Sequence, residues 1–321
     1  MSAVPSPLRL PEVPAAVLGI DVGGTDIKSA VVAASGSVGA VERRPTPRGA
    51  AALLDEIDLI ATAHAGRFDA VGLVVPGVVD GDVAVFSENL GWSDLPLGRL
   101  VRERLAVPVS FGQDVRAAAV AELLLGGGAP YRDPVVVVIG TGLSAVIVRD
   151  GVVVAGSPLV GEIGHAPVAG DGADEPCACG LVGCLEAVAS AASIARRYRR
   201  LSGRPVAGAR EVLDAATRGD EVAVGVWNAA VAALAFGLSH VVAALAPDAV
   251  LIAGGLSHAG AALVDPLREH LAARLSFHRM PVVEAARLGG EAGVLGAALA
   301  ARGMAARARM SAAPTRMAVA R

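Results

Sequence analysis

Aromatic residues are scarce in this chain, at 3% of its 321 residues. So few rings argue against a surface that stacks on nucleic-acid bases. The net charge of −3 also supplies no basic field for nucleic acid or for an anionic membrane. Because 54% of the residues are hydrophobic, the chain can bury a large core, and its length suggests about two domains. We therefore expect a globular protein whose partners are neither nucleic acids nor membranes.

Long uncharged runs need a separate test for membrane insertion. Residues 222–246 contain no Asp, Glu, Lys or Arg, and this run is long enough to cross a membrane as a helix. They contain Asn228, Ser239 and His240, however, and their larger apolar residues recur at helical spacing, so we predict a buried core helix. The proline-rich start, MSAVPSPLRLPEVPAA, lacks the apolar segment of a signal peptide. We expect a disordered lead-in over residues 1–16 and a cytoplasmic protein.

Cysteine occurs three times, all within residues 177–184. An odd number packed so closely does not describe a disulfide scaffold, so metal ligation is the natural interpretation. With one histidine the thiolates complete a Cys₃His set for tetrahedral zinc, and four filled positions make such a site structural. Gly180 and Gly183 favour a tight knuckle around a metal. The alternative is three reduced thiols and a surface histidine. The candidate ligands are His165, Cys177, Cys179 and Cys184.

Lysine occurs once, at Lys28, and every other basic side chain apart from histidine is arginine. It lies in residues 17–34, where two apolar runs are joined by the turn Gly23-Gly24-Thr25, a pattern that predicts a β-hairpin. Turn glycines let backbone N–H groups approach an anion, the ammonium adds a point charge, and Asp21 adds a carboxylate for a hydrated metal ion. These groups can grip a nucleotide phosphate and its Mg²⁺. The alternative is a plain hairpin.

The second half of the chain repeats this pattern at residues 135–148, around Gly140-Thr141-Gly142. The repeat predicts a duplicated α/β unit, with two phosphate-binding hairpins facing each other across a cleft. Further strands are expected over residues 37–43, 70–75, 107–111 and 249–253. Helices are expected over residues 50–65, 96–105, 114–125, 185–201, 209–218, 222–246, 259–275 and 293–309.

Three acidic residues and one glycine pair are further candidates for chemistry. Asp114 ends a strand and opens a helix, so it is either a helix cap or a general base held ionised by the helix N-terminus. Glu162 can share one face with the histidine three residues later. Glu186 follows the cysteine knuckle and is either an acceptor for hydroxyl groups or an ordinary first-turn acid. Gly254-Gly255 lets a flat ring approach the backbone.

Together these stretches resemble the ROK family (repressors, open reading frames and kinases), whose enzymes are sugar kinases. The similarity spans about residues 17–302. The motifs that carry it are Asp21-Val-Gly-Gly-Thr25 with Lys28, Pro76-Gly77-Val-Val-Asp80, Asn89-Leu-Gly-Trp92, Gly140-Thr-Gly142, Glu162-Ile-Gly-His165 and Cys177-x-Cys179-Gly-x-x-Gly-Cys184-Leu-Glu186. The resemblance implies an α/β protein with the actin-like ATPase (ribonuclease H-like) fold, in which two α/β domains flank a cleft for ATP and sugar.

The resemblance also implies roles for individual residues. Asp114 would be the catalytic base, and ATP, its Mg²⁺ and a structural zinc would be the cofactors. The implied substrate-binding residues are Gly77, Asn89, Gln113, Asp114, Glu162, His165 and Glu186. The implied nucleotide-binding residues are Asp21, Gly23, Gly24, Thr25, Lys28, Gly140, Thr141, Gly142, Gly254 and Gly255. The implied zinc ligands are His165, Cys177, Cys179 and Cys184.

The expected organisation is a small α/β domain over residues 17–113, joined by a returning helix at 293–309. A larger α/β domain with the second hairpin and the zinc loop covers residues 114–292, a tail covers 310–321, and the protein is a homodimer. The expected activity is ATP-dependent phosphorylation of a primary hydroxyl of a hexose, with glucose to glucose 6-phosphate as the default. A kinase for a C7-cyclitol, a sugar-sensing regulator and a catalytically weak sugar-binding homologue are the alternatives.

Two positions depart from the family pattern. Gln113 stands where the family usually has asparagine, which favours a substrate other than glucose. The phosphate donor is a separate question, and polyphosphate remains an alternative to ATP. Residues 143–146, Leu-Ser-Ala-Val, stand where the family often has more glycines. We expect their side chains to crowd the second phosphate-binding turn.

Overall fold

The computed structural model describes residues 10, 13, 15–87 and 90–312. The chain divides into two compact units: unit 1 is drawn from Met1–Ala121 and Glu291–Arg321, and unit 2 is Glu122–Gly290. Asn89 and most of the predicted lead-in and tail lie outside the described residues. Within the lead-in, Leu10 is buried and its N–H donates to the Gly36 carbonyl at 2.9 Å.

A five-stranded sheet of order β3-β2-β1-β4-β8 forms the centre of unit 1. Its strands are β1 (Val17–Val22), β2 (Asp26–Val32), β3 (Glu42–Pro45), β4 (Ala70–Val75) and β8 (Val109–Gln113). The first three pair antiparallel, whereas β1, β4 and β8 run parallel. β1 and β4 are buried along their whole lengths, which explains why their sequences are apolar apart from Asp21 in β1. A second, three-stranded antiparallel sheet consists of β5 (Val78–Asp80), β6 (Val83–Ser87) and β7 (Trp92–Leu95).

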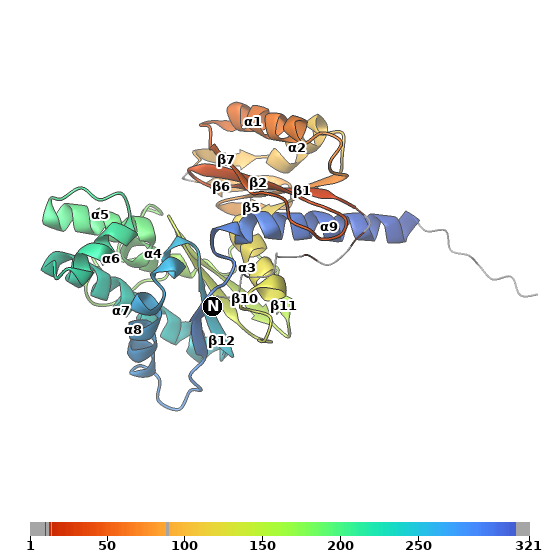
Figure 1. The fold of residues 1–321 in the computed structure, drawn as a ribbon. Helices are drawn as coiled ribbons and strands as arrows, with labels where there is room; N and C mark the ends of the chain where they lie inside the picture. The colour runs from red at the N-terminus through yellow and green to blue at the C-terminus, as the bar shows by residue number, and fades with distance from the viewer. Residues whose placement is uncertain (1–9, 11–12, 14, 88–89, 313–321) are drawn as a thin grey trace, which may run out of the picture. The chain divides into compact units, whose positions relative to one another are not determined.

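Helices cover both faces of the five-stranded sheet in unit 1 (Figure 1). α1 (Ala50–Ala63) and α2 (Leu97–Arg104) lie on one face and α9 (Ala292–Ala312) on the other. A Cβ on Gly72 would lie 1.9 Å from the carbonyl oxygen of Ala297, and one on Gly19 would lie 2.5 Å from that of Val294. Glycine in β1 and β4 therefore lets α9 lie directly on the sheet.

Unit 2 repeats this sheet arrangement, as the similarity between residues 17–34 and 135–148 predicts. The order is β11-β10-β9-β12-β13, again with two antiparallel pairings followed by two parallel ones. The strands are β9 (Val135–Ile139), β10 (Leu143–Arg149), β11 (Val152–Val153), β12 (Ala249–Ala253) and β13 (Val282–Ala285). α3 (Asp114–Leu125) begins directly after β8 in unit 1 and ends in unit 2.

The remaining helices of unit 2 pack around a core that includes β9, β10 and β12. They are α4 (Leu185–Ala189), α5 (Ala191–Ser202), α6 (Ala209–Thr217), α7 (Glu221–Leu245) and α8 (Ala261–Ala272). Single 3₁₀ turns occur at Ile163–His165, Gly255–Ala259 and Gly289–Glu291. α7 is the long apolar helix, and 56% of its most hydrophobic 18-residue stretch is buried inside the protein, so no membrane span is indicated.

Two predicted helices differ from those observed. The predicted helix over 185–201 is two helices, because Ser190 takes an extended conformation and its side chain caps α5 by accepting from the Ser193 N–H. The helix predicted from 259 starts at Ala261, because Gly260 has a φ of 55°. Inside α8, Pro266 has no N–H for the carbonyl of Ala262, which instead accepts from Trp227 Nε1 at 3.2 Å.

Candidate active site and metal centre

The parallel strands of unit 1 bring several predicted site residues to one edge of the sheet. Asp21 lies one residue before the end of β1, Gly77 follows β4, and Gln113 ends β8. In register, Asp21 pairs with Val74, and the next residue, Val75, pairs with Gln113. Carboxyl ends of adjacent parallel strands are the usual place for ligands in α/β sheets. Sequence positions more than 90 residues apart therefore meet within one unit.

Asp21 and Lys28 face each other across the first hairpin. They are partners in the antiparallel register of β1 and β2, and Lys28 Nζ lies 3.5 Å from Asp21 Oδ2. Asp21 is 6% exposed, and this burial raises the pKa of its carboxyl group, while Lys28 acts in the opposite direction. A Cβ on Gly293 at the start of α9 would lie 2.4 Å from Asp21 Oδ2, so only glycine fits there.

Asp114 is the first residue of α3 and is partly buried. Its Oδ1 accepts from the Val115 N–H at 2.7 Å. Burial raises the pKa of Asp114 to about 8, and the nearby Asp21 carboxyl group adds to the rise. The expectation that the helix N-terminus keeps this carboxylate ionised at neutral pH is therefore wrong for the ligand-free protein. Desolvation and a second carboxyl group outweigh the helix N-terminus.

Gln113 braces the loop that follows β4. Its Nε2 donates to the carbonyl oxygen of Gly77 at 2.9 Å, so the side-chain amide connects two of the predicted sugar-side segments. Gly77 has a φ of 95°, and a Cβ there would lie 2.1 Å from the carbonyl oxygen of Phe86. Glycine is thus required at this position by both conformation and space.

Thr46 stabilises the first glycine turn, Gly23-Gly24-Thr25, through two hydrogen bonds. Its Oγ1 donates to the carbonyl oxygen of Gly23 at 2.7 Å, and its N–H donates to that of Thr25 at 2.8 Å. Gly24 and Thr25 are exposed. The turn is therefore fixed in position while its tip remains accessible to a ligand.

The two glycine segments of unit 2 follow adjacent strands. β9 and β12 are parallel, and Gly140-Thr141-Gly142 and Gly254-Gly255 follow their carboxyl ends. Gly254 has a φ of 79°, and a Cβ there would lie 2.6 Å from the carbonyl oxygen of Ile139. A Cβ on Gly255 would meet nothing within 4 Å. The structure therefore brings these two predicted nucleotide segments together within one unit.

The predicted crowding by residues 143–146 is wrong for the two side chains that point into the core. Leu143 and Ala145 are each 2% exposed and belong to the hydrophobic core of unit 2. Ser144 faces the other way, and its Oγ donates to Glu162 Oε1 at 3.3 Å. Strand alternation thus directs Leu143 and Ala145 away from the turn.

Glu186 lies in the first turn of α4 and contacts the second glycine turn. Its Oε2 accepts from the Leu143 N–H at 2.7 Å. A Cβ on Gly142 would lie 2.8 Å from the same oxygen, so the turn approaches the carboxylate closely. Gly164, between Glu162 and His165, lies against Leu143 as well, since its Cβ would be 2.0 Å from the Leu143 carbonyl oxygen. The structure therefore gathers Glu162, His165 and Glu186 beside the second hairpin.

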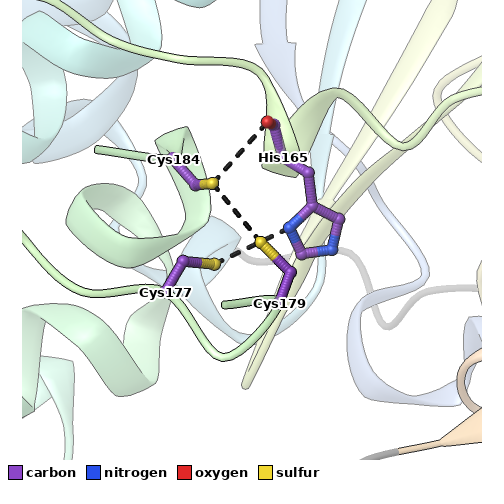
Figure 2. Close-up of side chains that lie close together, drawn as sticks. All are labelled: His165, Cys177, Cys179 and Cys184. Carbon is purple, nitrogen blue, oxygen red and sulfur yellow. Dashed lines mark hydrogen bonds between the residues drawn. The ribbon is translucent and has the colours of Figure 1, made fainter. Parts of the chain in front are cut away.

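The three cysteines and His165 form a compact cluster (Figure 2). Their four ligand atoms lie within 4.8 Å of one another. His165 Nδ1 is 3.7 Å from Cys177 Sγ, and Cys179 Sγ is 3.6 Å from Cys184 Sγ. Zinc–sulfur bonds of about 2.3 Å in a tetrahedron place sulfurs about 3.8 Å apart, so these separations fit a zinc ion. Burial raises the pKa of Cys184 to about 12, as expected of a thiol that becomes a thiolate only beside a cation.

Both predicted knuckle glycines adopt left-handed conformations. Gly180 has a φ of 90° and Gly183 a φ of 76°. A Cβ on Gly183 would lie 2.4 Å from the carbonyl oxygen of Ala173. The loop therefore needs glycine at these two positions to turn back on itself.

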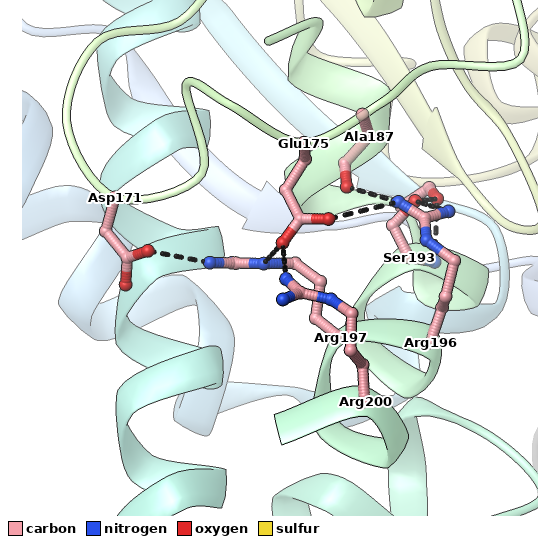
Figure 3. A network of polar contacts seen from close by, with 8 residues as sticks. Asp171, Glu175, Ala187, Ser193, Arg196, Arg197 and Arg200 are labelled. Atoms are coloured by element: carbon pink, nitrogen blue, oxygen red, sulfur yellow. Dashed lines mark hydrogen bonds and ion pairs between the residues drawn. The ribbon is translucent and has the colours of Figure 1, made fainter. Parts of the chain in front are cut away.

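A buried ion-pair network supports the loop that carries the cysteines (Figure 3). Arg197 on α5 is 2% exposed, and it donates to Glu175 Oε1 at 2.9 Å and to Asp171 Oδ1 at 2.8 Å. Arg200 also pairs with Glu175, and Arg196 donates to the Ala187 carbonyl oxygen at 2.8 Å. The network joins the loop before Cys177 to α5, and Arg196 joins α5 to α4. The sequence analysis did not predict this network. The cluster of four arginines in residues 196–200, Arg-Arg-Tyr-Arg-Arg, was the feature that could have indicated it.

Comparison with known proteins identifies the family. The model of the ROK family matches residues 17–303. A glucokinase from Halalkalibacterium halodurans is 32% identical over 309 residues, covering 87% of this chain and 92% of that protein. An N-acetylgalactosamine kinase from Shewanella sp. is 30% identical over 292 residues, covering 86% and 93%. The structure of a ROK glucokinase from Streptomyces griseus, in complex with glucose and AMPPNP, matches with a TM-score of 0.78 and 30% identity, covering 90% of this chain and 99% of that one.

The fold is accordingly that of the ROK kinases, the actin-like ATPase fold, as the sequence predicts. Kinases for different sugars resemble this chain at about the same identity, so the comparisons define the enzyme type more sharply than the sugar. The chain belongs to the ROK family, as a sugar kinase of the hexokinase and glucokinase type.

Proposed function

We propose that this protein is an ATP-dependent hexose kinase that phosphorylates a primary hydroxyl group, with glucose to glucose 6-phosphate as its reaction. The observation that carries the proposal is that the partly buried Asp114 lies near the buried Asp21, which pairs with the single lysine, at the carboxyl edge of the unit 1 sheet. Burial gives Asp114 a pKa of about 8, which suits a group that must accept a proton near neutral pH. The family and the glucose-bound relative support hexose as the acceptor.

In the proposed reaction, Asp114 acts as the catalytic base in its ionised form. The acceptor hydroxyl oxygen forms a bond to the γ-phosphorus of ATP, and the bond from that phosphorus to the β,γ-bridging oxygen breaks. The hydroxyl proton moves to the Asp114 carboxylate, and ADP leaves with the bonding electron pair. Gln113, whose Nε2 is held by the Gly77 carbonyl oxygen, offers its Oε1 to a sugar hydroxyl. Glu162, His165 and Glu186 bind the other ring hydroxyls.

Nucleotide-binding roles are proposed for the glycine segments of the two hairpins and for the glycine pair after β12. Gly23, Gly24, Thr25 and Lys28 would bind phosphate oxygens, as would Gly140, Thr141 and Gly142. Gly254 and Gly255 would contact the base, because the open space beside Gly255 admits a flat ring. Asp21 fits a hydrated Mg²⁺, since its ion pair with Lys28 is long at 3.5 Å and leaves the carboxylate oxygens available to metal-bound water. Such an ion would neutralise charge on the phosphates.

The Cys₃His cluster is proposed to hold one structural zinc ion. All four positions of a tetrahedron are filled by His165, Cys177, Cys179 and Cys184, which leaves none for a substrate. The ion would fix the loop that precedes α4, and with it Glu186. We also propose a homodimer, which sedimentation velocity tests directly.

An acceptor panel tests the proposal. Zinc-loaded protein is assayed by coupled ADP release with glucose, mannose, an N-acetylhexosamine, a C7-cyclitol and no acceptor, with ATP or polyphosphate as donor. We expect turnover with a hexose and ATP, and a loss of several orders of magnitude in Asp114→Asn with sugar binding retained. Preference for a cyclitol would replace the hexose assignment, and absence of turnover with every acceptor would refute the kinase.

A further inference from the structure

Glu122 is a fully buried carboxylate that the proposed reaction does not use. It is 0% exposed and lies at the end of α3. Its Oε1 accepts from the Leu288 N–H at 2.7 Å, and its Oε2 accepts from the N–H groups of Gly127 and Arg287, both at 3.1 Å. Three backbone N–H donors therefore satisfy its two oxygens, which offsets much of the cost of burying this polar group.

The three N–H donors lie close to the two points at which the chain passes between the units. The chain passes from unit 1 to unit 2 inside α3, between Ala121 and Glu122, and returns between Gly290 and Glu291. Gly127 follows the first crossing by a few residues, and Arg287 and Leu288 precede the second. One carboxylate therefore binds both segments that connect the units, on the unit 2 side.

The glycine run after α3 is shaped around this carboxylate. A Cβ on Gly126 would lie 2.0 Å from Glu122 Oε2, so any side chain there would displace the carboxylate. At Gly127 the corresponding Cβ would meet Arg287 Cγ at 3.4 Å, which is an ordinary contact. Neither glycine has a positive φ. Close approach to Glu122, and not backbone conformation, thus explains the glycine at 126.

The same helix carries the proposed catalytic base at its other end. α3 runs without interruption from Asp114 to Leu125, and the eight-residue separation of Asp114 and Glu122 corresponds to about 12 Å along the helix. A rigid helix transmits any rotation at its anchored end to the residue at its free end.

We propose that Glu122 is a positioning residue that clamps Gly127 and the segment Arg287–Leu288 to the end of α3, and that this clamp sets the orientation of the helix. The proposal rests on the proposed function only for its kinetic consequence, because Asp114, at the other end of α3, is the residue that the clamp would orient. The clamp itself is defined by the three hydrogen bonds and is independent of the substrate.

Hydrogen exchange and kinetics of two variant pairs test this. Glu122→Gln keeps the shape but turns an NH₂ group toward backbone donors, and Glu284→Gln is its control, since Glu284 accepts from Tyr131 Oη at 3.3 Å nearby. Gly126→Ala displaces the carboxylate without removing it, and Gly127→Ala is its control. The second pair keeps the test valid if Glu122→Gln fails to fold.

In Glu122→Gln and Gly126→Ala we expect the amides of Gly127, Arg287 and Leu288 to exchange about tenfold faster, from the loss of one buried hydrogen bond. Amides of β9 should keep their protection. The KM for hexose should rise while kcat falls, at an unchanged active fraction, and both controls should match the parent. Uniformly faster exchange, or a fall in kcat at constant KM, would reduce Glu122 to a structural role and overturn the proposal. If no sugar is phosphorylated, local exchange still supports the clamp and unchanged exchange still refutes it.

Discussion

Replacing Asp114 by asparagine should make the ligand-free protein more stable at neutral pH. The native carboxyl group has a pKa of about 8, whereas an aspartate in the unfolded chain titrates near 3.9. Between these values the unfolded chain releases the proton and the native protein keeps it, so ionisation favours unfolding. At pH 7 the difference is about three pKa units, or at most about 4 kcal/mol, since one unit is worth about 1.4 kcal/mol. Asparagine stays neutral, and its side-chain oxygen can still accept from the Val115 N–H.

The stability gain of Asp114→Asn should depend on pH, and the direction of this dependence follows from the raised pKa of Asp114. The stability conferred by a protonated Asp114 is complete below about pH 4 and is lost as pH rises through about 8. Urea unfolding of Asp114→Asn and parent at pH 4, 6 and 8 should therefore show a stability gain that grows with pH. Asp265→Asn, which removes one exposed ion pair with Arg268, serves as the control and should change little. A gain independent of pH, or an asparagine variant less stable at every pH, would refute the burial argument.

Three further outcomes are expected. Gly72→Ala should destabilise unit 1 by about 2 kcal/mol or more in urea unfolding, because its Cβ would lie 1.9 Å from a carbonyl oxygen of α9, whereas Gly225→Ala in α7, with open space around it, should stabilise by up to about 1 kcal/mol. The purified protein should contain one zinc per chain by atomic absorption, and chelation should lower its melting temperature; a zinc-free protein of equal stability would contradict the structural site. Glu175→Gln should leave Arg197 poorly paired and speed zinc release to a chromophoric chelator, while Asp174→Asn on the same loop should not; equal rates would mean that the network does not support the knuckle.

Much of the fold is predictable because its central elements have unambiguous sequences. β4, β9 and β12 match their predicted ranges, since each is a short apolar run buried on both faces. α3 matches as well, because Asp114 marks a clear transition from strand to helix. β5, β6 and β7 were missed, since these segments of three to five residues are too short for a clear pattern and form strands through their pairing with one another.

In the candidate site, too, local features were predictable from the sequence and features that depend on distant residues were not. Local motifs predicted the first hairpin and the Cys₃His cluster, because their residues are close in sequence or of diagnostic type. The raised pKa of Asp114 was not predictable, since it depends first on the burial of its side chain and then on Asp21, which the register of three parallel strands brings near it. The clamp at Glu122 joins residues more than 160 positions apart and has no local pattern.

The pH dependence of hexose phosphorylation tests the central claim most directly. The parameter kcat/KM reports the ionisation of the free enzyme, in which burial gives Asp114 a pKa of about 8. If this residue is the base, kcat/KM for glucose should rise with pH to a plateau with a midpoint near 8, and Asp114→Asn should show neither the activity nor the rise. A profile that is flat or falls across this range in the parent, or substantial turnover by Asp114→Asn, would contradict the account.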